Sequence, residues 1–155
     1  MTRECKFCRI ARRELSAQVV ADTAGTLAFL PLRPVTIGHT LVIPKTHVPD
    51  LWAAAPQLAA SVTNEAIRVG RAIAAALRPD GMNLITSAGV AASQTELHLH
   101  LHVVPRWSGD HFGHLWPRGE SWLEAEQVRE DMAAIIADAC AAISGASVPV
   151  SESHR

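Results

Sequence analysis

Apolar residues along the first half of the chain follow the periods of strands and then of one long helix. Short apolar runs at 19–21 and 26–30 flank the turn-forming sequence 22–25, which predicts a β-hairpin. After a loop rich in proline and glycine, a further apolar run predicts a strand at 40–43. From residue 56 to residue 77, apolar positions recur at mostly helical intervals, which indicates the main amphipathic helix.

The second half of the chain adds two strands, a long loop and a helix. Strands are expected at 82–85 and 97–104, joined by a loop of small residues. The segment 106–121 holds Trp, His and Phe among glycines and prolines, and loops of this kind often cover a site. A second helix is predicted from about residue 122 to residue 143.

Composition agrees with one globular domain of ordinary size. Of the 155 residues, 48% are hydrophobic, which is enough for a core, and we predict one domain at 1–145 with a disordered tail at 146–155. The formal charge of -1 leaves no basic excess for binding nucleic acid or a membrane surface, so we expect a small molecule recognised locally. The N-terminus lacks the apolar run of a signal peptide and no segment is long enough to span a bilayer, so a cytoplasmic location is expected.

Three histidines alternate with aliphatic residues in the run 97–104. On a strand such alternation places His98, His100 and His102 on one face and the aliphatic residues on the other, which is the expected core face. A polar surface strand would not need three titratable rings, so catalysis or metal binding is favoured. The outer two rings would lie about 13 Å apart along a strand, so at most two of the three could share one metal ion.

The run HLHLHVV resembles the signature of the histidine triad (HIT) family, His-x-His-x-His followed by two hydrophobic residues. The segments CKFCRI, LAFL, GHTLVIPKTH and SQTELHLHLHVVPR also resemble that family, in its order, and together cover most of residues 5–106. The resemblance implies an α+β fold with an antiparallel sheet of about five strands and two main helices. It also implies a homodimer that binds a nucleotide substrate.

The resemblance assigns chemical roles to particular residues. The middle histidine of the family attacks an α-phosphorus and forms a covalent nucleotidyl-histidine, and that role falls on His100. His102 would donate a hydrogen bond to the phosphate oxygens or to the departing group. Substrate contacts fall on Gln94, Thr95 and His39; for His39 the alternative is a loop histidine satisfied by water.

The chain departs from the family pattern at two positions. Pro31 follows LAFL where the family commonly has an aspartate that holds the ribose hydroxyls, and proline offers no such acceptor. Arg33 or a residue of the tryptophan-rich loop is a candidate to compensate. Ser87 stands where many members have an asparagine. Recognition of the nucleoside is therefore left open.

Two cysteines near the N-terminus, Cys5 and Cys8, form a CxxC pair that could bind metal or act in redox chemistry. In many bacterial HIT proteins, zinc is bound by such a pair with the histidine of PKTH and the first triad histidine, which are His47 and His98 here. The resemblance thus implies a closed, structural zinc site and no requirement for a catalytic metal. Cys140 is expected to be a small buried residue of the second helix.

The implied activity is cleavage at the α-phosphate of a nucleoside phosphoramidate or a dinucleoside polyphosphate. One alternative is a phosphate-dependent dinucleoside polyphosphate phosphorylase, because the VVPRW run and the tryptophan-rich loop resemble actinobacterial members of that sort. Another is a nucleotide-binding partner protein with little activity. Pro31 and Ser87 allow that reading, whereas the intact His100 and His102 oppose it.

Overall fold

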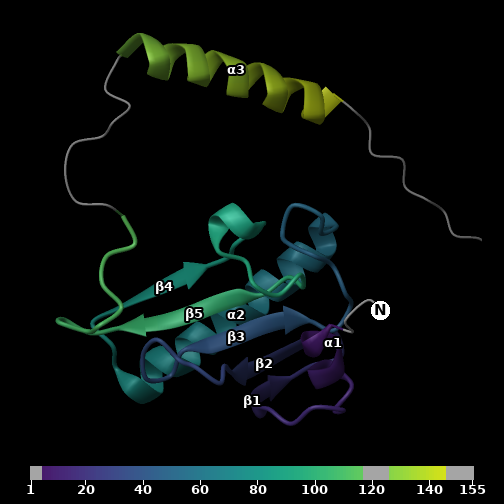
Figure 1. Cartoon of the computed structure of the whole chain (residues 1–155), viewed down its shortest axis with the longest axis vertical. Coiled ribbons are helices and arrows are strands. Elements are labelled where there is room, and N and C mark those ends of the chain that lie inside the picture. The colour runs from purple at the N-terminus through teal and green to yellow at the C-terminus, as the bar shows by residue number, and fades with distance from the viewer. Residues whose placement is uncertain (1–4, 117–125, 146–155) are drawn as a thin grey trace, which may run out of the picture. The chain divides into compact units, whose positions relative to one another are not determined.

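The computed structural model describes residues 5–116 and 126–145. The elements in chain order are α1 (Lys6–Ala11), β1 (Gln18–Asp22), β2 (Thr26–Leu30), β3 (Thr40–Pro44), α2 (Pro56–Leu77), β4 (Gly81–Ile85), the short 3-10 helix η1 (Val90–Ala92), β5 (Leu101–Arg106) and α3 (Glu126–Gly145) (Figure 1). The chain forms two compact units, Met1–Gly113 and His114–Arg155. In the part of the chain that is described, no helix has both the length and the apolar character needed to cross a membrane.

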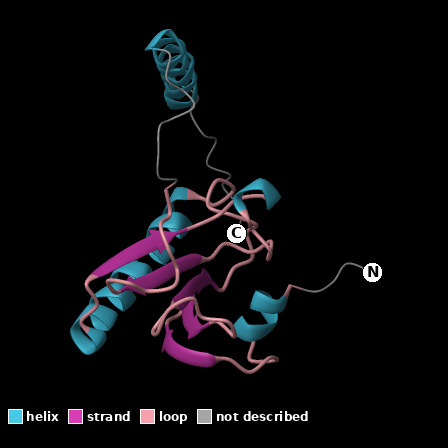
Figure 2. Cartoon of the chain, turned by 60° about the vertical axis from the view of Figure 1, so that its left-hand side comes forward, coloured by secondary structure: helices cyan, strands magenta, loops and turns pink. Residues whose placement is uncertain are grey.

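The first unit is built on one antiparallel sheet of five strands in the order β1-β2-β3-β5-β4. Its central strands carry the candidate chemistry, since β5 lies between β3 and β4 and its His102 is paired with Leu41 on one side and Ile85 on the other. The helix α2 runs across one face of the sheet, and the short α1 packs against the other face (Figure 2).

The alternation of side chains along the strands gives the sheet two apolar faces. The face under α2 buries Ala28, Val42, Leu101 and Val103 against Val62, Ala66 and Val69 of the helix. The face under α1 buries Leu27, Phe29, Leu41 and Ile43 together with Phe7. Because Leu101 and Val103 face α2, the intervening His102 faces the α1 side of the sheet. His102 thus lies on the side of the sheet that also carries the N-terminal cysteines.

Most predicted elements are confirmed, including the five-stranded antiparallel sheet, the hairpin at 18–30 and the helix over 56–77. The pattern of apolar residues does not predict the helix α1, since its six residues are too few to show a helical period. The sulfur of Cys5 caps this helix by accepting a hydrogen bond from the Cys8 amide. In the second unit, α3 begins at Glu126, and residues 122–125 and 146–155 of the predicted helix and tail lie outside the described residues. Cys140 is exposed on α3, so the expectation that it is buried is wrong.

The predicted strand at 97–104 begins later than expected, at Leu101. Position 99 would come opposite Pro44 in the register of β3 and β5, and proline has no amide hydrogen with which to continue the ladder. The Leu99 amide donates instead to the Val48 carbonyl at 2.7 Å. Leu97 is 65% exposed and does not belong to the core face, contrary to the prediction.

Candidate functional site

His39 and His102 form one hydrogen-bonded pair at the centre of the sheet. The rings are stacked with centroids 5.1 Å apart, and His39 Nε2 lies 2.9 Å from His102 Nδ1. The Val35 amide donates to His39 Nδ1 at 3.2 Å, which leaves the proton of neutral His39 on Nε2. His39 Nε2–H therefore donates to His102 Nδ1, and the proton of neutral His102 lies on its own Nε2. His102 is thus prepared as a hydrogen-bond donor through Nε2.

The backbone before β3 is shaped so that His39 can reach this position. The His39 amide closes a turn on the Thr36 carbonyl at 3.2 Å, and Gly38 has a positive φ of 78°. A Cβ at position 38 would lie 2.5 Å from the Leu77 side chain and 3.4 Å from that of Pro105. The positive φ therefore favours glycine at this position, where the loop comes close to the end of the Leu77 side chain on α2.

His100 is held in the opposite tautomer. Its Nδ1 lies 2.7 Å from the His98 carbonyl, which can only accept, so the proton of neutral His100 is on Nδ1 and the Nε2 lone pair is free. The Thr86 hydroxyl donates to the carbonyl of His100 at 3.1 Å. The ring is 7% exposed and contacts the ring of His102 at a centroid distance of 4.8 Å. An unprotonated ring nitrogen and a ring N–H donor therefore come from neighbouring histidines.

Burial favours the uncharged forms of His39 and His102. It lowers the pKa of His39, and it lowers the pKa of His102 to about 4, with repulsion from any charge on His100 and His39 adding to the effect. At neutral pH His102 is accordingly a neutral imidazole. The tautomers assigned from the hydrogen bonds of neutral rings are thus the relevant ones.

The four residues predicted to bind zinc lie together, and we call Cys5, Cys8, His47 and His98 the cysteine–histidine cluster. Their ligand atoms all lie within 4.8 Å of one another. Cys5 Sγ and Cys8 Sγ are 3.3 and 3.5 Å from His98 Nδ1, His47 Nδ1 is 3.3 Å from Cys8 Sγ, and the two Nδ1 atoms are 3.2 Å apart. Tetrahedral zinc, from its usual bond lengths, separates sulfur from nitrogen by about 3.6 Å and nitrogen from nitrogen by about 3.3 Å. The donor set and spacing fit zinc.

The imidazole of His98 is also oriented as a metal ligand requires. Its side chain is fully buried, and Nε2 lies 2.9 Å from the Pro44 carbonyl. Donation by Nε2–H to that carbonyl leaves the Nδ1 lone pair directed at the two cysteines. Metal-binding histidines commonly fix their second nitrogen in this way.

Comparison with known proteins agrees with the fold and the cluster. The HIT domain family model matches residues 12–109. The chain is 37% identical over 113 residues to Protein hit of Bacillus subtilis, covering 72% of this chain and 78% of the relative. The chain belongs to the HIT family. It is also 34% identical over 107 residues to the adenylylsulfatase HINT3 of Arabidopsis thaliana, covering 69% of this chain and 54% of that protein.

Two solved HIT structures are similar to this one throughout most of their length. A HIT family protein of Bacillus anthracis superposes with a TM-score of 0.80 at 34% identity, covering 90% of this chain and 99% of the other. A zinc-bound histidine triad family protein of Mycobacterium smegmatis superposes with a TM-score of 0.68 at 36% identity, covering 88% and 97%. Together with the cysteine–histidine cluster, that zinc-bound relative supports zinc binding by this HIT protein.

Gln94 and Thr95 occupy different environments in this HIT chain. Gln94 is 6% exposed, its Oε1 accepts from the Gly89 amide at 2.8 Å, and its Nε2 donates to the Pro49 carbonyl at 2.6 Å. This side chain therefore braces the loop that precedes β5. Thr95 is exposed beside it. Contact of either residue with substrate stays a prediction.

The loop after β5 is ordered by Arg106. The guanidinium donates to both carboxylate oxygens of Asp110, at 2.7 and 2.8 Å, to Asn83 at 2.8 Å and to the Gly113 carbonyl at 2.6 Å. It also lies 4.8 Å from the ring centre of Phe112. Hydrogen bonding to Arg106 holds the pKa of Asp110 far below its usual range. That the tryptophan-rich loop covers the site stays a prediction.

Two residues that contact the site were not found from the sequence. Phe7 touches the rings of both His98 and His100, and Thr86 bonds the main chain of His100. An apolar aromatic within a CxxC turn was a usable signal for Phe7, since such a residue must be buried where the cysteines converge. Nothing in the sequence distinguished Thr86 from other threonines at a strand end.

Proposed function

We propose that this HIT protein is a nucleotidyl hydrolase or transferase in which His100 Nε2 attacks the α-phosphorus of a nucleoside phosphoramidate or a dinucleoside polyphosphate. The hydrogen bond from His100 Nδ1 to the His98 carbonyl carries this proposal, because it leaves Nε2 unprotonated. A neutral imidazole is an effective nucleophile near pH 7, and covalent catalysis divides one difficult substitution into two easier steps.

In the first step the Nε2–phosphorus bond forms and the bond from phosphorus to the leaving group breaks. The leaving group departs with the electron pair while His102 Nε2–H donates a hydrogen bond to the departing atom, and an amine leaving group takes its proton from solvent. His39 supports this role by keeping the Nδ1 of His102 hydrogen-bonded, so that the proton of His102 faces the reaction. The positive charge on the nucleotidyl-His100 ring is stabilised by its Nδ1–H bond to the His98 carbonyl.

In the second step a water molecule attacks the same phosphorus. The water loses one proton to solvent, its oxygen bonds to phosphorus, and the bond between phosphorus and His100 Nε2 breaks with the electron pair left on Nε2. A nucleoside monophosphate leaves, and His100 returns to its neutral Nδ1–H form, while His102 keeps its Nε2 proton throughout. Inorganic phosphate as the acceptor in place of water would yield a nucleoside diphosphate.

We also propose that zinc held by Cys5, Cys8, His47 and His98 is structural. Cys5, Cys8, His47 and His98 would hold the ion with two thiolates and two imidazoles, so zinc would supply cohesion between α1 and the approach to β5 and would leave no position for a reacting water. The chemistry then belongs to His100 and His102. Elemental analysis of purified protein tests the metal, with one zinc per chain expected.

The activity is tested by release of AMP from adenosine 5′-phosphoramidate and from a diadenosine polyphosphate, with and without phosphate. Adenylyl sulfate joins the panel, because the similar HINT3 of Arabidopsis thaliana is an adenylylsulfatase. We expect AMP release by wild type and its loss in His100→Ala, with an adenylylated peptide trapped by quenching in alkaline denaturant only in wild type. ADP formed only with phosphate would identify a phosphorylase. No turnover of any of these by zinc-loaded wild type would reject the enzyme and favour a nucleotide-binding partner protein.

We further propose that the protein is a homodimer, as the family resemblance implies. The strand β4 is an edge of the sheet, and its Leu84 is 51% exposed, while Ile67 on α2 is 44% exposed. An exposed apolar edge strand is stabilised by pairing with a second copy. Light scattering after size-exclusion chromatography tests this, with a mass of one chain counting against it.

A further inference from the structure

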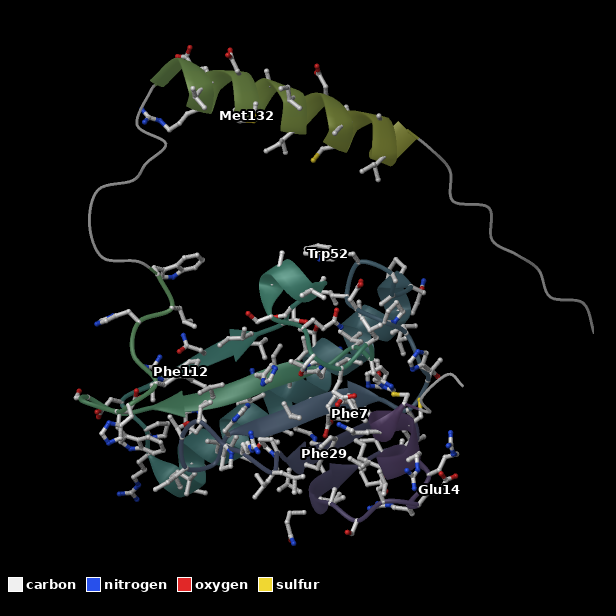
Figure 3. All side chains as sticks on the ribbon, in the orientation of Figure 1. Phe7, Glu14, Phe29, Trp52, Phe112 and Met132 are labelled. Carbon is white, nitrogen blue, oxygen red and sulfur yellow. The ribbon has the colours of Figure 1, made fainter. Side chains whose placement is uncertain are left out.

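Phe7 lies between the cysteine–histidine cluster and the proposed nucleophile. Its ring makes edge-to-face contact with His98, at a centroid distance of 5.8 Å, and with His100, at 5.3 Å. It is 9% exposed and also contacts Phe29, at 5.6 Å (Figure 3). Such contacts fix the plane of an imidazole, because aromatic pairs prefer edge-to-face geometry.

The position of Phe7 depends on the two cysteines. Cys5 caps α1 and Cys8 lies within it, so both flank Phe7 on one helical turn. The six residues of α1 are too few to be a stable helix alone. Besides apolar packing and the ion pair of Lys6 with Glu96 at 2.7 Å, the convergence of both sulfur atoms on His98 Nδ1 attaches this turn to the approach to β5.

A second connection runs through the main chain. The His98 side chain is fixed at Nδ1 by the cluster and at Nε2 by the Pro44 carbonyl, and the carbonyl of this same residue accepts from His100 Nδ1 at 2.7 Å. The peptide after His98 is held as well by its Leu99 amide, which donates at 2.7 Å to the carbonyl of Val48, the residue after the cluster ligand His47, and rotation of this peptide would remove the His98 acceptor. The tautomer of His100 then would no longer be determined.

We propose that Phe7 is a positioning residue for His100, and that it and the His98 carbonyl are held in place by the metal-loaded cysteine–histidine cluster. The inference rests on the proposed function in taking His100 as the nucleophile. It adds that metal occupancy controls the orientation and tautomer of a ring that binds no metal. The metal is then required for the rate although it takes no part in either chemical step.

The first test compares zinc-loaded wild type with Phe7→Leu. Nitrogen-15 NMR of the histidine rings, assigned with His100→Gln, reports the His100 tautomer without any turnover. Wild type should show Nδ1–H alone, and Phe7→Leu should keep its zinc but show both tautomers. Its kcat should fall by about 10- to 100-fold, because an ångström-scale misplacement of a reacting group costs on the order of 100-fold.

Phe29→Leu is the matched control. Phe29 is 3% exposed, belongs to the same apolar cluster and contacts Phe7, so its loss reduces packing to a comparable degree. It should retain the wild-type His100 spectrum and a kcat within about threefold. Equal effects of the two variants would overturn the inference, as would a wild-type spectrum and rate in Phe7→Leu.

Chelation of zinc from wild type provides a second measurement that needs no substitution. Zinc-depleted protein should show both His100 tautomers, and added zinc should restore the single one. If Phe7→Leu does not fold, this comparison decides, and identical His100 spectra with and without zinc overturn the inference. Absence of turnover in wild type with the expected spectra would reject the proposed function while leaving the positioning of His100 intact.

Discussion

Acidification should destabilise this protein through His102. Burial, together with repulsion from charge on His100 and His39, lowers the pKa of His102 to about 4, against 6.5 for an unperturbed histidine. Well above pH 6.5 the His102 ring is neutral in both the folded and the unfolded chain, so its titration does not reduce the free energy of unfolding. Between pH 6.5 and pH 4 only the unfolded chain takes up the proton, so stability is lost as the pH falls.

The size of the effect follows from the two pKa values. Proton linkage predicts that the free energy of unfolding falls, through His102 alone, by about 2 kcal/mol at pH 5 and about 3 kcal/mol at pH 4. A His102→Gln variant lacks this titration and retains a hydrogen-bonding side chain. The difference in unfolding free energy between wild type and variant should therefore decrease by these amounts as the pH is lowered.

Urea unfolding followed by tryptophan fluorescence at pH 7.5, 6, 5 and 4 measures this difference, and any loss of zinc in acid affects both proteins alike. Thr95→Val, an exposed change near the same site that removes no titrating group, should give a difference independent of pH. A constant difference between wild type and His102→Gln would show that His102 is not the buried neutral ring described above.

Three further outcomes are expected. Elemental analysis should show that Cys8→Ser has lost zinc, and its thermal midpoint should be lower by about 10 °C or more, since a structural zinc contributes several kcal/mol. The control Cys140→Ser on α3 should match wild type in zinc content and thermal midpoint. Asp110→Asn should lower the thermal midpoint by more than Glu14→Gln does. Each carboxylate accepts two bonds from an arginine, but Asp110 also accepts from the Trp107 and Phe112 amides, and its side chain is 10% exposed against 44% for Glu14. The side chain of Pro31 offers no acceptor for ribose hydroxyls, so 2′-deoxyadenosine 5′-phosphoramidate should be cleaved with a kcat/KM within about threefold of that for the ribonucleotide. A tenfold or greater preference for the ribonucleotide would contradict this.

The elements that depend on local periodicity could be predicted from the sequence. The apolar spacing of α2 fixed both of its ends, and turn chemistry located the hairpin of β1 and β2. The start of β5 could not be predicted in this way. It depends on which residue of β3 comes opposite position 99, and only the register shows that this residue is Pro44.

The cysteine–histidine cluster was predicted from family resemblance and is confirmed as a group of converging ligand atoms. What could not be predicted is how the remaining histidines are oriented. His39 and His102 are 63 positions apart, and their hydrogen bond depends on the loop that Gly38 allows to approach α2. Sequence spacing carries no information on which ring nitrogen holds a proton.

In this site, main-chain groups determine which ring nitrogen of a histidine holds the proton. The Val35 amide fixes the tautomer of His39, the Pro44 carbonyl fixes that of His98, and the His98 carbonyl fixes that of His100. None of these main-chain bonds is made to His102, and its tautomer follows from its hydrogen bond with His39. Replacing His39 with an apolar residue of similar size should therefore impair His102 as a donor and leave the His100 tautomer unchanged. A site arranged in this way separates the orientation of the donor, which comes through the loop before β3, from that of the nucleophile, which comes through α1 and the cluster.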